Sequence, residues 1–228
     1  MTSIKPALFL FITLLSLASC KKKNPVTQPV KFTSTTYKTL GTNDVFGKPD
    51  YLTTPDVISP DLLSFVYNTL PEHKDLRITN PELLTTKAIA DIKITAPSDV
   101  SVTYVSAGTG HTNSLAFYTY PTNQPPATAK DIVTIIYIFP NCGNRTTLKQ
   151  GDKVNIGKFN VGTSIGFVLM QDGWDTINNK LNNNAVHFCS NDVLNPEVDP
   201  NLKKHAVLIN YAPENKVLIG FEDIDRTL

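Results

Sequence analysis

The chain has 228 residues, of which 41% are hydrophobic and 18% are charged, a composition typical of globular proteins. Its Gly and Pro residues are too few and too irregularly spaced for a collagen-like chain. Lys and Arg total 21 against 20 acidic residues, so no excess of positive charge indicates a polyanionic ligand. We therefore expect no nucleic-acid partner.

Residues 1–19 have the order of a secretory signal peptide, because Lys5 precedes an apolar run from Ala7 to Ala18. A helix of that length spans about 18 Å, well short of a bilayer core of roughly 30 Å, so an anchor helix is not expected. The run ends in Leu17-Ala18-Ser19-Cys20, which resembles the lipobox of bacterial lipoproteins. We predict that Cys20 carries the lipid, diacylglycerol and palmitate; the alternative is an ordinary cysteine near a signal cleavage site.

Residues 20–43 are predicted to form a lipidated, flexible tether, because Lys21 to Lys23 lead into a polar stretch with Pro25 and Pro29. Each lysine would favour an anionic membrane surface by roughly 1 kcal/mol. No Asp follows the cysteine, so we expect attachment at the outer membrane or cell surface rather than the inner membrane. No later apolar segment approaches twenty residues, so the N-terminal lipid is the expected membrane contact.

One helix is predicted after Ser59, which can cap it, because Pro60 suits a first turn and Asp61 favours the N-terminal dipole. Pro71 is expected to end it. The apolar positions at helical spacing, which we expect to pack in the core, are Leu63, Val66, Tyr67 and Leu70.

Elsewhere apolar residues recur with period two, which is typical of strands. The runs are 100–105, 115–120, 132–139, 164–171, 186–190, 205–211 and 216–222. Polar turns separate them, so the predicted fold class is mainly β: an antiparallel β-sandwich, jelly-roll-like, with one short N-terminal helix. We expect a small mixed N-terminal segment over residues 44–98 and the β-sandwich domain over residues 99–228.

Two cysteines remain besides Cys20. In an exported protein a disulfide between Cys142 and Cys189 is allowed, and closing that loop would stabilise the fold by up to roughly 4 kcal/mol. Two free, packed thiols are the equal alternative. A zinc site is disfavoured because no paired-ligand spacing accompanies these cysteines or the histidines.

Gly162 to Gly166 matches the G-x-S-x-G pattern of serine hydrolases, with Ser164 at the nucleophile position. That chemistry needs a strand-to-helix turn, whereas Ile165 to Met170 continues as a β run, so we expect no catalytic residues and no enzyme. The aromatics Phe117, Tyr118 and Tyr120 suit a sugar-stacking platform, but core packing accounts for them more economically.

Several blocks together resemble the LruC-type domain of bacterial lipoproteins. These blocks are Val100–Val105, Asn113–Pro121, Phe139–Asn141, Leu148–Val154, Ile165–Leu169 and Gly173-Trp174. The segments Leu194–Glu197 and His205–Ile224 are similar to domain of unknown function 4114. The resemblance covers residues from about Val45 to the end and implies a secreted, β-rich surface module with no established reaction.

In that family an Asp-rich segment and a further strand follow the Glu-Asp pair, whereas this chain ends at Arg226-Thr227-Leu228. We therefore expect a truncation at the acidic motif, which would leave a sheet edge unpaired. The remaining acids suggest calcium, which takes six to eight oxygen ligands. The candidate ligands are Glu222, Asp223, Asp225, Asp192, Asn195 and Glu197. The alternative is that these are solvated turn residues.

The expected function is that of a lipid-anchored, non-enzymatic protein of the bacterial cell envelope, acting in adhesion or ligand binding, with a glycan or an envelope protein as partner. Calcium would assist binding if the loop with Asp192, Asn195 and Glu197 converges with the strand end that carries Glu222, Asp223 and Asp225. The alternative is a structural or assembly component of the envelope. An envelope hydrolase is the third and weakest hypothesis, because no nucleophile or acid–base arrangement fits its context.

Overall fold

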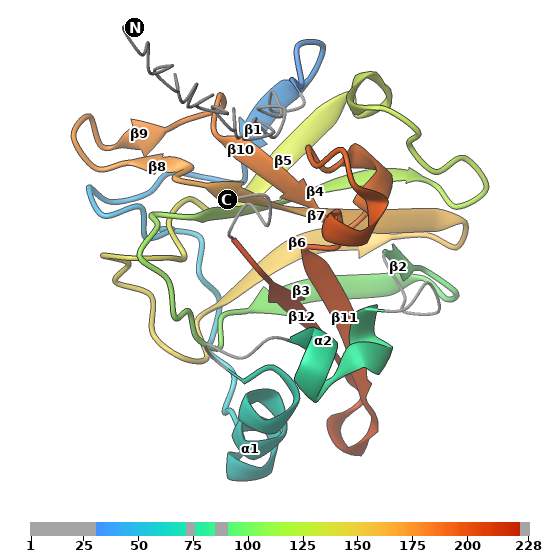
Figure 1. Cartoon of the computed structure of the whole chain (residues 1–228). Helices are drawn as coiled ribbons and strands as arrows, with labels where there is room; N and C mark the ends of the chain where they lie inside the picture. Colours follow the sequence, from blue (N-terminus) through green and yellow to red (C-terminus); the bar gives the residue numbers. More distant parts are fainter. Residues whose placement is uncertain (1–30, 72–75, 85–90, 224–228) are drawn as a thin grey trace, which may run out of the picture.

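The computed structural model describes residues 31–71, 76–84 and 91–223. The predicted signal peptide, Cys20 and Asp225 lie outside these residues. Helical structure is limited to α1 (Pro60–Thr69), the short α2 (Leu76–Thr79) and several 3-10 turns within the described part of the chain. The fold is mainly β, as predicted (Figure 1).

One sheet forms the larger layer. Its strands, in spatial order, are β1 (Thr36–Thr39), β5 (Thr134–Phe139), β4 (Ser114–Pro121), β7 (Thr163–Gln171) and β10 (Val186–Cys189). The short β2 (Ile92–Lys93) pairs with the same edge of β7 as β10, farther along the strand. All these pairs are antiparallel except β1 with β5, which is parallel.

Two strand pairs form the facing layer, below the large sheet in Figure 1. One pair is β3 (Ser98–Thr103) with β6 (Lys153–Phe159), and the other is β11 (Ala206–Tyr211) with β12 (Lys216–Phe221). A two-stranded hairpin, β8 (Trp174–Asp175) with β9 (Lys180–Leu181), projects from the end of the large sheet.

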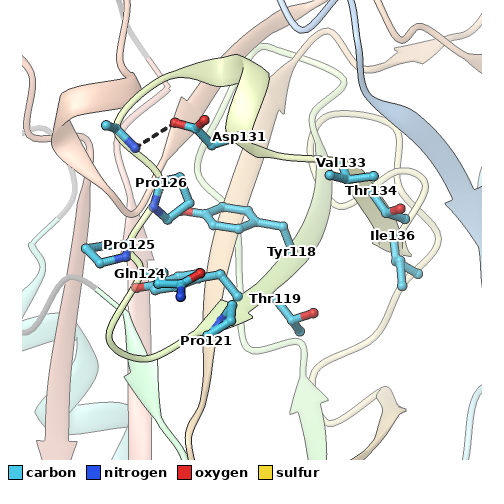
Figure 2. Close-up of a pocket in the computed structure, with 12 residues that line it drawn as sticks. Tyr118, Thr119, Pro121, Gln124, Pro125, Pro126, Asp131, Val133, Thr134 and Ile136 are labelled. Carbon is cyan, nitrogen blue, oxygen red and sulfur yellow. Dashed lines mark hydrogen bonds between the residues drawn. The ribbon is translucent and has the colours of Figure 1, made fainter.

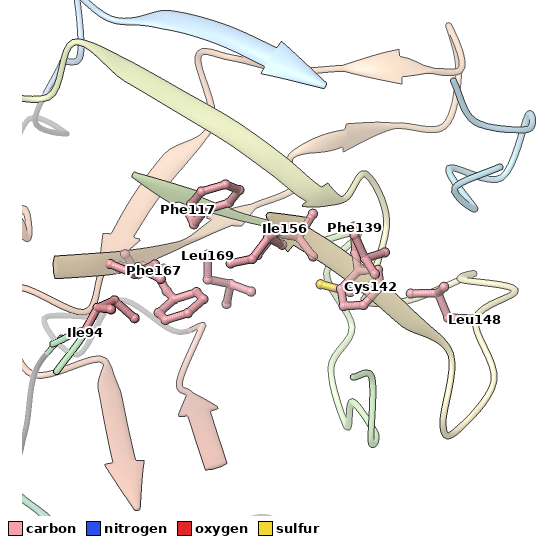
Figure 3. Packing of buried hydrophobic residues seen from close by; sticks show 12 residues of the cluster. Ile94, Phe117, Phe139, Cys142, Leu148, Ile156, Phe167 and Leu169 are labelled. Atoms are coloured by element: carbon pink, nitrogen blue, oxygen red, sulfur yellow. The ribbon is translucent and has the colours of Figure 1, made fainter. Parts of the chain in front are cut away.

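The core between the layers follows from strand alternation. On β7, Ile165, Phe167 and Leu169 point to the facing layer, where they pack with Ile156 of β6 and the partly buried Phe221 of β12. Figure 3 shows this packing of side chains from both layers. The antiparallel β-sandwich is therefore built on period-two burial.

The outer face of the large sheet carries a second core. Here Val168 and Met170 of β7 are covered by Phe32 before β1, by Ile132 in the β4–β5 loop and by Leu194 after β10. Both faces of β7 are consequently buried, which explains its almost unbroken apolar run.

Helix α1 begins and ends as predicted. Ser59 Oγ accepts a hydrogen bond from the Leu62 N–H (3.1 Å), and Pro60 occupies the first turn. The predicted core stripe is partly wrong, because Leu62 is the fully buried side chain of the helix and Tyr67 is 48% exposed. The helix packs on the β11–β12 hairpin through Phe65, whose ring centre lies 4.9 Å from that of Tyr211.

The predicted tether boundary is wrong from Phe32 onward. Phe32 is buried, and β1 bonds to β5, so residues 32–39 are part of the large sheet's layer. The predicted segment 44–98 is likewise joined to the sandwich: the Thr53 N–H donates to the Lys153 carbonyl (2.8 Å), and β2 pairs with β7.

Candidate functional site

A pocket of about 600 Å³ lies among β4, the start of β5 and the loop that joins them. We call it the β4–β5 pocket. Strand β4 contributes residues 118–121, the loop contributes residues 124–127 with Asp131 and Val133, and β5 contributes Thr134 and Ile136. Figure 2 shows Tyr118 at its centre, with Pro125 and Pro126 on one side and Thr134 and Ile136 on the other. Its volume is within the roughly 300–1,000 Å³ of small-molecule sites.

The pocket exists because β4 and β5 pair over only part of their length. Their register ends at Phe117↔Ile136, whereas β4 continues beside β7 as far as Pro121↔Thr163. No ladder bonds therefore join the part of β4 after Phe117 to the part of β5 before Ile136. The pocket is located between these two parts.

The loop over the pocket is held by Asp131. Its Oδ2 accepts hydrogen bonds from the N–H groups of Ala127 (3.0 Å) and Thr128 (2.8 Å) and from the Thr128 hydroxyl (3.1 Å). These bonds, those from Thr128 first, lower the pKa of Asp131, so its carboxylate is charged at neutral pH. Ala129 and Ile132 anchor the same loop in the outer core. Hydrogen bonds and buried side chains within the protein thus hold this wall of the pocket in place, and no ligand is needed for that.

The backbone of Thr119 faces the pocket side of β4. The Thr122 N–H donates to the Gly162 carbonyl (2.8 Å), so even-numbered residues of β4 direct their backbone groups toward β7. Thr119 and Pro121 then face the opposite side, where Pro121 has no N–H and its carbonyl accepts from Gln124 N–H (2.8 Å). Thr119 therefore supplies an N–H and a C=O at the pocket.

Behind the pocket, the buried carboxylate of Asp91 holds Tyr120 of β4 by a hydrogen bond. The Tyr120 hydroxyl donates to Asp91 Oδ2 (2.6 Å), and the Ser190 hydroxyl donates to Asp91 Oδ1 (2.5 Å). Burial raises the pKa of Asp91 despite these two bonds. The Tyr118 ring lies directly over Gly166, and burial raises the pKa of Tyr118 and Tyr120 well above 10. The Tyr118 hydroxyl has no hydrogen-bond partner among the described residues, and both phenols stay protonated at neutral pH.

The predicted acidic loops come together through a histidine. Glu197 Oε1 lies 2.5 Å from His205 Nε2, and His205 Nδ1 lies 3.1 Å from the Glu222 carbonyl oxygen. Glu197 and His205 are both buried, and the imidazole stacks on Phe188 with ring centres 4.0 Å apart. His205 thus connects the loop after β10 to the end of β12.

The other predicted calcium ligands have separate partners. Asn195 is fully buried, and its side chain bonds to the backbone of Cys189 and of Lys203. Asp192 Oδ2 lies 3.5 Å from Lys204 Nζ. Asp223 Oδ2 accepts from the amide of Asn113 (2.5 Å) and from the hydroxyl of Thr109. These bonds connect the segments before β11 and after β12, at the end of the hairpin where Ala206 pairs with Phe221.

Within the described residues, no three or more His, Cys, Asp or Glu side chains are grouped so that they could hold a metal ion. Asp225 lies outside those residues. Calcium binding by this set remains a prediction, and Asn195 and Glu197 already use side-chain oxygens in bonds within the protein.

Cys142 and Cys189 are free thiols, so of the two alternatives, a disulfide or two packed thiols, the structure has the packed thiols. Cys142 packs in the core between the layers, whereas Cys189 packs in the outer core, on the other face of the large sheet. A disulfide between them is not formed, because the large sheet separates the two side chains. Burial raises the pKa of Cys142 to about 12 and that of Cys189 further, which keeps both thiols protonated.

Ser164 lies within β7, as expected from the β run that follows it. Its side chain is buried and its hydroxyl lies 2.9 Å from that of Thr122. The three aromatics pack in the cores, which is the more economical of the two interpretations: Phe117 lies between the layers, whereas Tyr118 and Tyr120 are on the outer face of the large sheet.

In the described residues, no helix is long and apolar enough to cross a membrane. Cys20 and the three lysines after it precede residue 31, where the described chain begins. Their predicted roles therefore remain predictions.

The sequence interpretation missed the β4–β5 pocket. Tyr118 and Tyr120 were considered, but the loop residues Gln124, Pro125 and Pro126 were not. A usable signal is present: Pro121 at a strand edge indicates that pairing with a neighbour stops there, and two further prolines stiffen the loop that follows.

Comparison with known families gives one match. Residues 159–227 match the family model described as domain of unknown function (DUF4114). The matched segment begins at the last residue of β6 and includes β7 to β12, with the Glu197–His205 pair, but excludes the residues that line the β4–β5 pocket. No curated protein and no solved structure matches this chain.

Proposed function

We propose that this chain is a lipid-anchored protein of the bacterial cell envelope, of the LruC type, that binds a ligand in the β4–β5 pocket and catalyses no reaction. The lipid on Cys20 attaches it to the outer membrane or the cell surface, and the sandwich presents the pocket to a glycan or a protein of the envelope.

The observation that carries the binding role is the construction of the pocket. The wall is fixed by the bonds to Asp131, and the floor consists of the buried Tyr118, which packs against Gly166, and the half-buried Tyr120, which bonds to Asp91. A site that is ordered before binding loses little conformational entropy when a ligand enters. The lining of the pocket combines apolar rings with fixed polar groups in similar proportion.

Anchoring is supported by the order of Lys5, the apolar run and Leu17-Ala18-Ser19-Cys20. It is tested by expressing the full chain and Cys20→Ala in a bacterial host fed with radiolabelled palmitate, with Cys189→Ala as the matched cysteine control. We expect label and membrane sedimentation for the wild type and the control, and neither for Cys20→Ala. Labelled or membrane-bound Cys20→Ala would disprove the lipid anchor.

An assembly component of the envelope is the second candidate, and one observation favours it. Phe46 (53% exposed) and Ile177 (88% exposed) project from two loops whose bases meet, since Gly47 lies against the buried Trp174 of β8. Phe46→Ser with Ile177→Ser should then shift the protein to a smaller complex on native gels of detergent-solubilised envelopes. An unchanged migration would exclude this role for the two loops.

A further inference from the structure

We propose that the β4–β5 pocket takes an uncharged saccharide, which packs on Tyr120, Pro121 and Pro125 and bonds to Thr119, Gln124 and Thr134. This inference rests on the proposed binding function and specifies its ligand class.

The charge of the pocket favours a neutral ligand. Among the described residues that line it, Asp131 is the one charged side chain, and no Lys, Arg or His is present. Phosphate, sulfate and carboxylate ligands are normally held by cationic side chains or by several convergent N–H groups. An anionic ligand would meet the Asp131 carboxylate without such compensation.

The walls of the pocket offer rigid apolar surfaces. Pro121 and Pro125 are exposed and Tyr120 is half-buried, whereas Val133, which is 71% exposed, lies with Thr134 on the opposite side of the pocket (Figure 2). Rings and short branched side chains lose little side-chain entropy when they are covered. They match the C–H faces of a pyranose ring, which are apolar and flat.

Uncharged hydrogen-bonding groups are interspersed with these surfaces. The pocket has the side-chain amide of Gln124, the hydroxyl of Thr134 and the backbone N–H and C=O of Thr119. Asp131 Oδ1 takes no part in the three bonds that hold the loop, and the side chain is exposed. A purely apolar ligand would cover these groups without pairing them, which costs free energy, whereas sugar hydroxyls both donate and accept.

The edge of β4 disfavours an extended peptide as the ligand. Strand addition needs a row of free backbone groups along the receiving strand. Here Thr119 supplies one pair of groups, while Pro121 has no N–H and its carbonyl is used by Gln124. The edge ends too soon to bind a strand.

The test uses the mature chain on an array of neutral oligosaccharides of glucose, galactose, mannose and N-acetylglucosamine, with sulfated and uronic-acid counterparts. Binding is then quantified by calorimetry. Ala127→Trp fills the pocket from its exposed rim, Thr134→Val removes one hydroxyl, and Val198→Trp adds the same indole at a remote exposed site.

We expect at least one neutral saccharide to bind, with affinity reduced tenfold or more by Ala127→Trp, severalfold by Thr134→Val and not by Val198→Trp. Absence of neutral-sugar binding, a preference for the acidic sugars, or binding that Ala127→Trp leaves intact would each overturn the saccharide assignment. If the array is negative but Ala127→Trp still abolishes binding to isolated envelopes, the assignment fails and the proposed binding function stands.

Discussion

The imidazole Nε2 of His205 lies 2.5 Å from the carboxylate Oε1 of Glu197, with both side chains withdrawn from solvent. Glu197 Oε2 has no hydrogen-bond partner among the described residues, so His205 is the main compensation for this buried acid. Because His205 also bonds to the Glu222 carbonyl, the pair fastens the loop after β10 to the β11–β12 hairpin.

We therefore expect Glu197→Leu to lower the free energy of unfolding by roughly 1–3 kcal/mol, since it leaves the imidazole Nε2 buried without its hydrogen-bond partner. The measurement is urea unfolding followed by fluorescence. Val198→Ala, at the exposed neighbouring position, is the control and should change stability by less than about 0.5 kcal/mol. Equal effects of the two substitutions would show that the pair does not fasten the loop.

His187 gives the fold a pH dependence. Its Nδ1–H donates to the Ala185 carbonyl (2.7 Å), Nε2 accepts from the Tyr37 hydroxyl (2.8 Å), and Phe32 stacks on the ring. Burial lowers the pKa of His187 to about 4, so the folded protein needs the neutral imidazole.

The unfolded chain binds a proton at His187 near pH 6.5, and the folded protein binds it only near pH 4, so stability falls as the pH falls through this window. Between pH 7 and pH 5 the loss from this residue is about 2 kcal/mol. His187→Gln should lack this part of the pH dependence in unfolding experiments at the two pH values. An identical pH dependence in the variant would contradict the assignment.

Gly166 is required by the position of Tyr118 under the pocket. A Cβ added at Gly166 would lie 2.1 Å from Tyr118 Cζ, and the ring has no room to move because the side chain is 2% exposed. Gly166→Ala should therefore destabilise the protein by roughly 1–3 kcal/mol or more. Gly110→Ala, where a Cβ meets nothing within 4 Å, is the matched control. Thermal melts should rank the two variants in that order, and the reverse order would refute the packing argument.

Ser190 links the ends of β10 and β2, which lie one after the other along the same edge of β7. Its hydroxyl donates to Asp91, and its Oγ accepts from the Phe167 N–H (2.8 Å). Ser190→Ala leaves both groups buried with one bond fewer, at a cost of roughly 1–3 kcal/mol. Ser101→Ala, at an exposed position of β3, should cost much less in the same denaturant series. Similar losses of stability in Ser190→Ala and Ser101→Ala would contradict the prediction and would mean that water replaces the Ser190 hydroxyl.

The strands of the sandwich could be predicted because burial of one face imposes period two. The run predicted at 164–171 is β7 (Thr163–Gln171), and that predicted at 115–120 is β4 (Ser114–Pro121). β1 could not be predicted in the same way, since Thr36 to Thr39 has no alternation and gains its partner from β5. β6 was also missed, although Val154 and Ile156 alternate with polar neighbours.

The pocket and the Glu197–His205 pair could not be predicted, because both are formed by contacts between residues distant in the chain. The acidic residues were recognisable, but the role of Glu197 is set by His205 and Phe188, which no local pattern joins. The pocket arises where the pairing of β4 and β5 stops, and register is a property of both strands together. For the cysteines the spacing left two outcomes open, and the intervening sheet decides between them.

Binding of the purified mature chain to isolated bacterial envelopes tests the central claim most directly. The measurement is the amount bound at increasing protein concentration for the wild type, Ala127→Trp and Val198→Trp. The proposed function predicts saturable binding that Ala127→Trp weakens at least tenfold and Val198→Trp leaves unchanged. Saturable binding that is equal in all three proteins would contradict a role for the β4–β5 pocket.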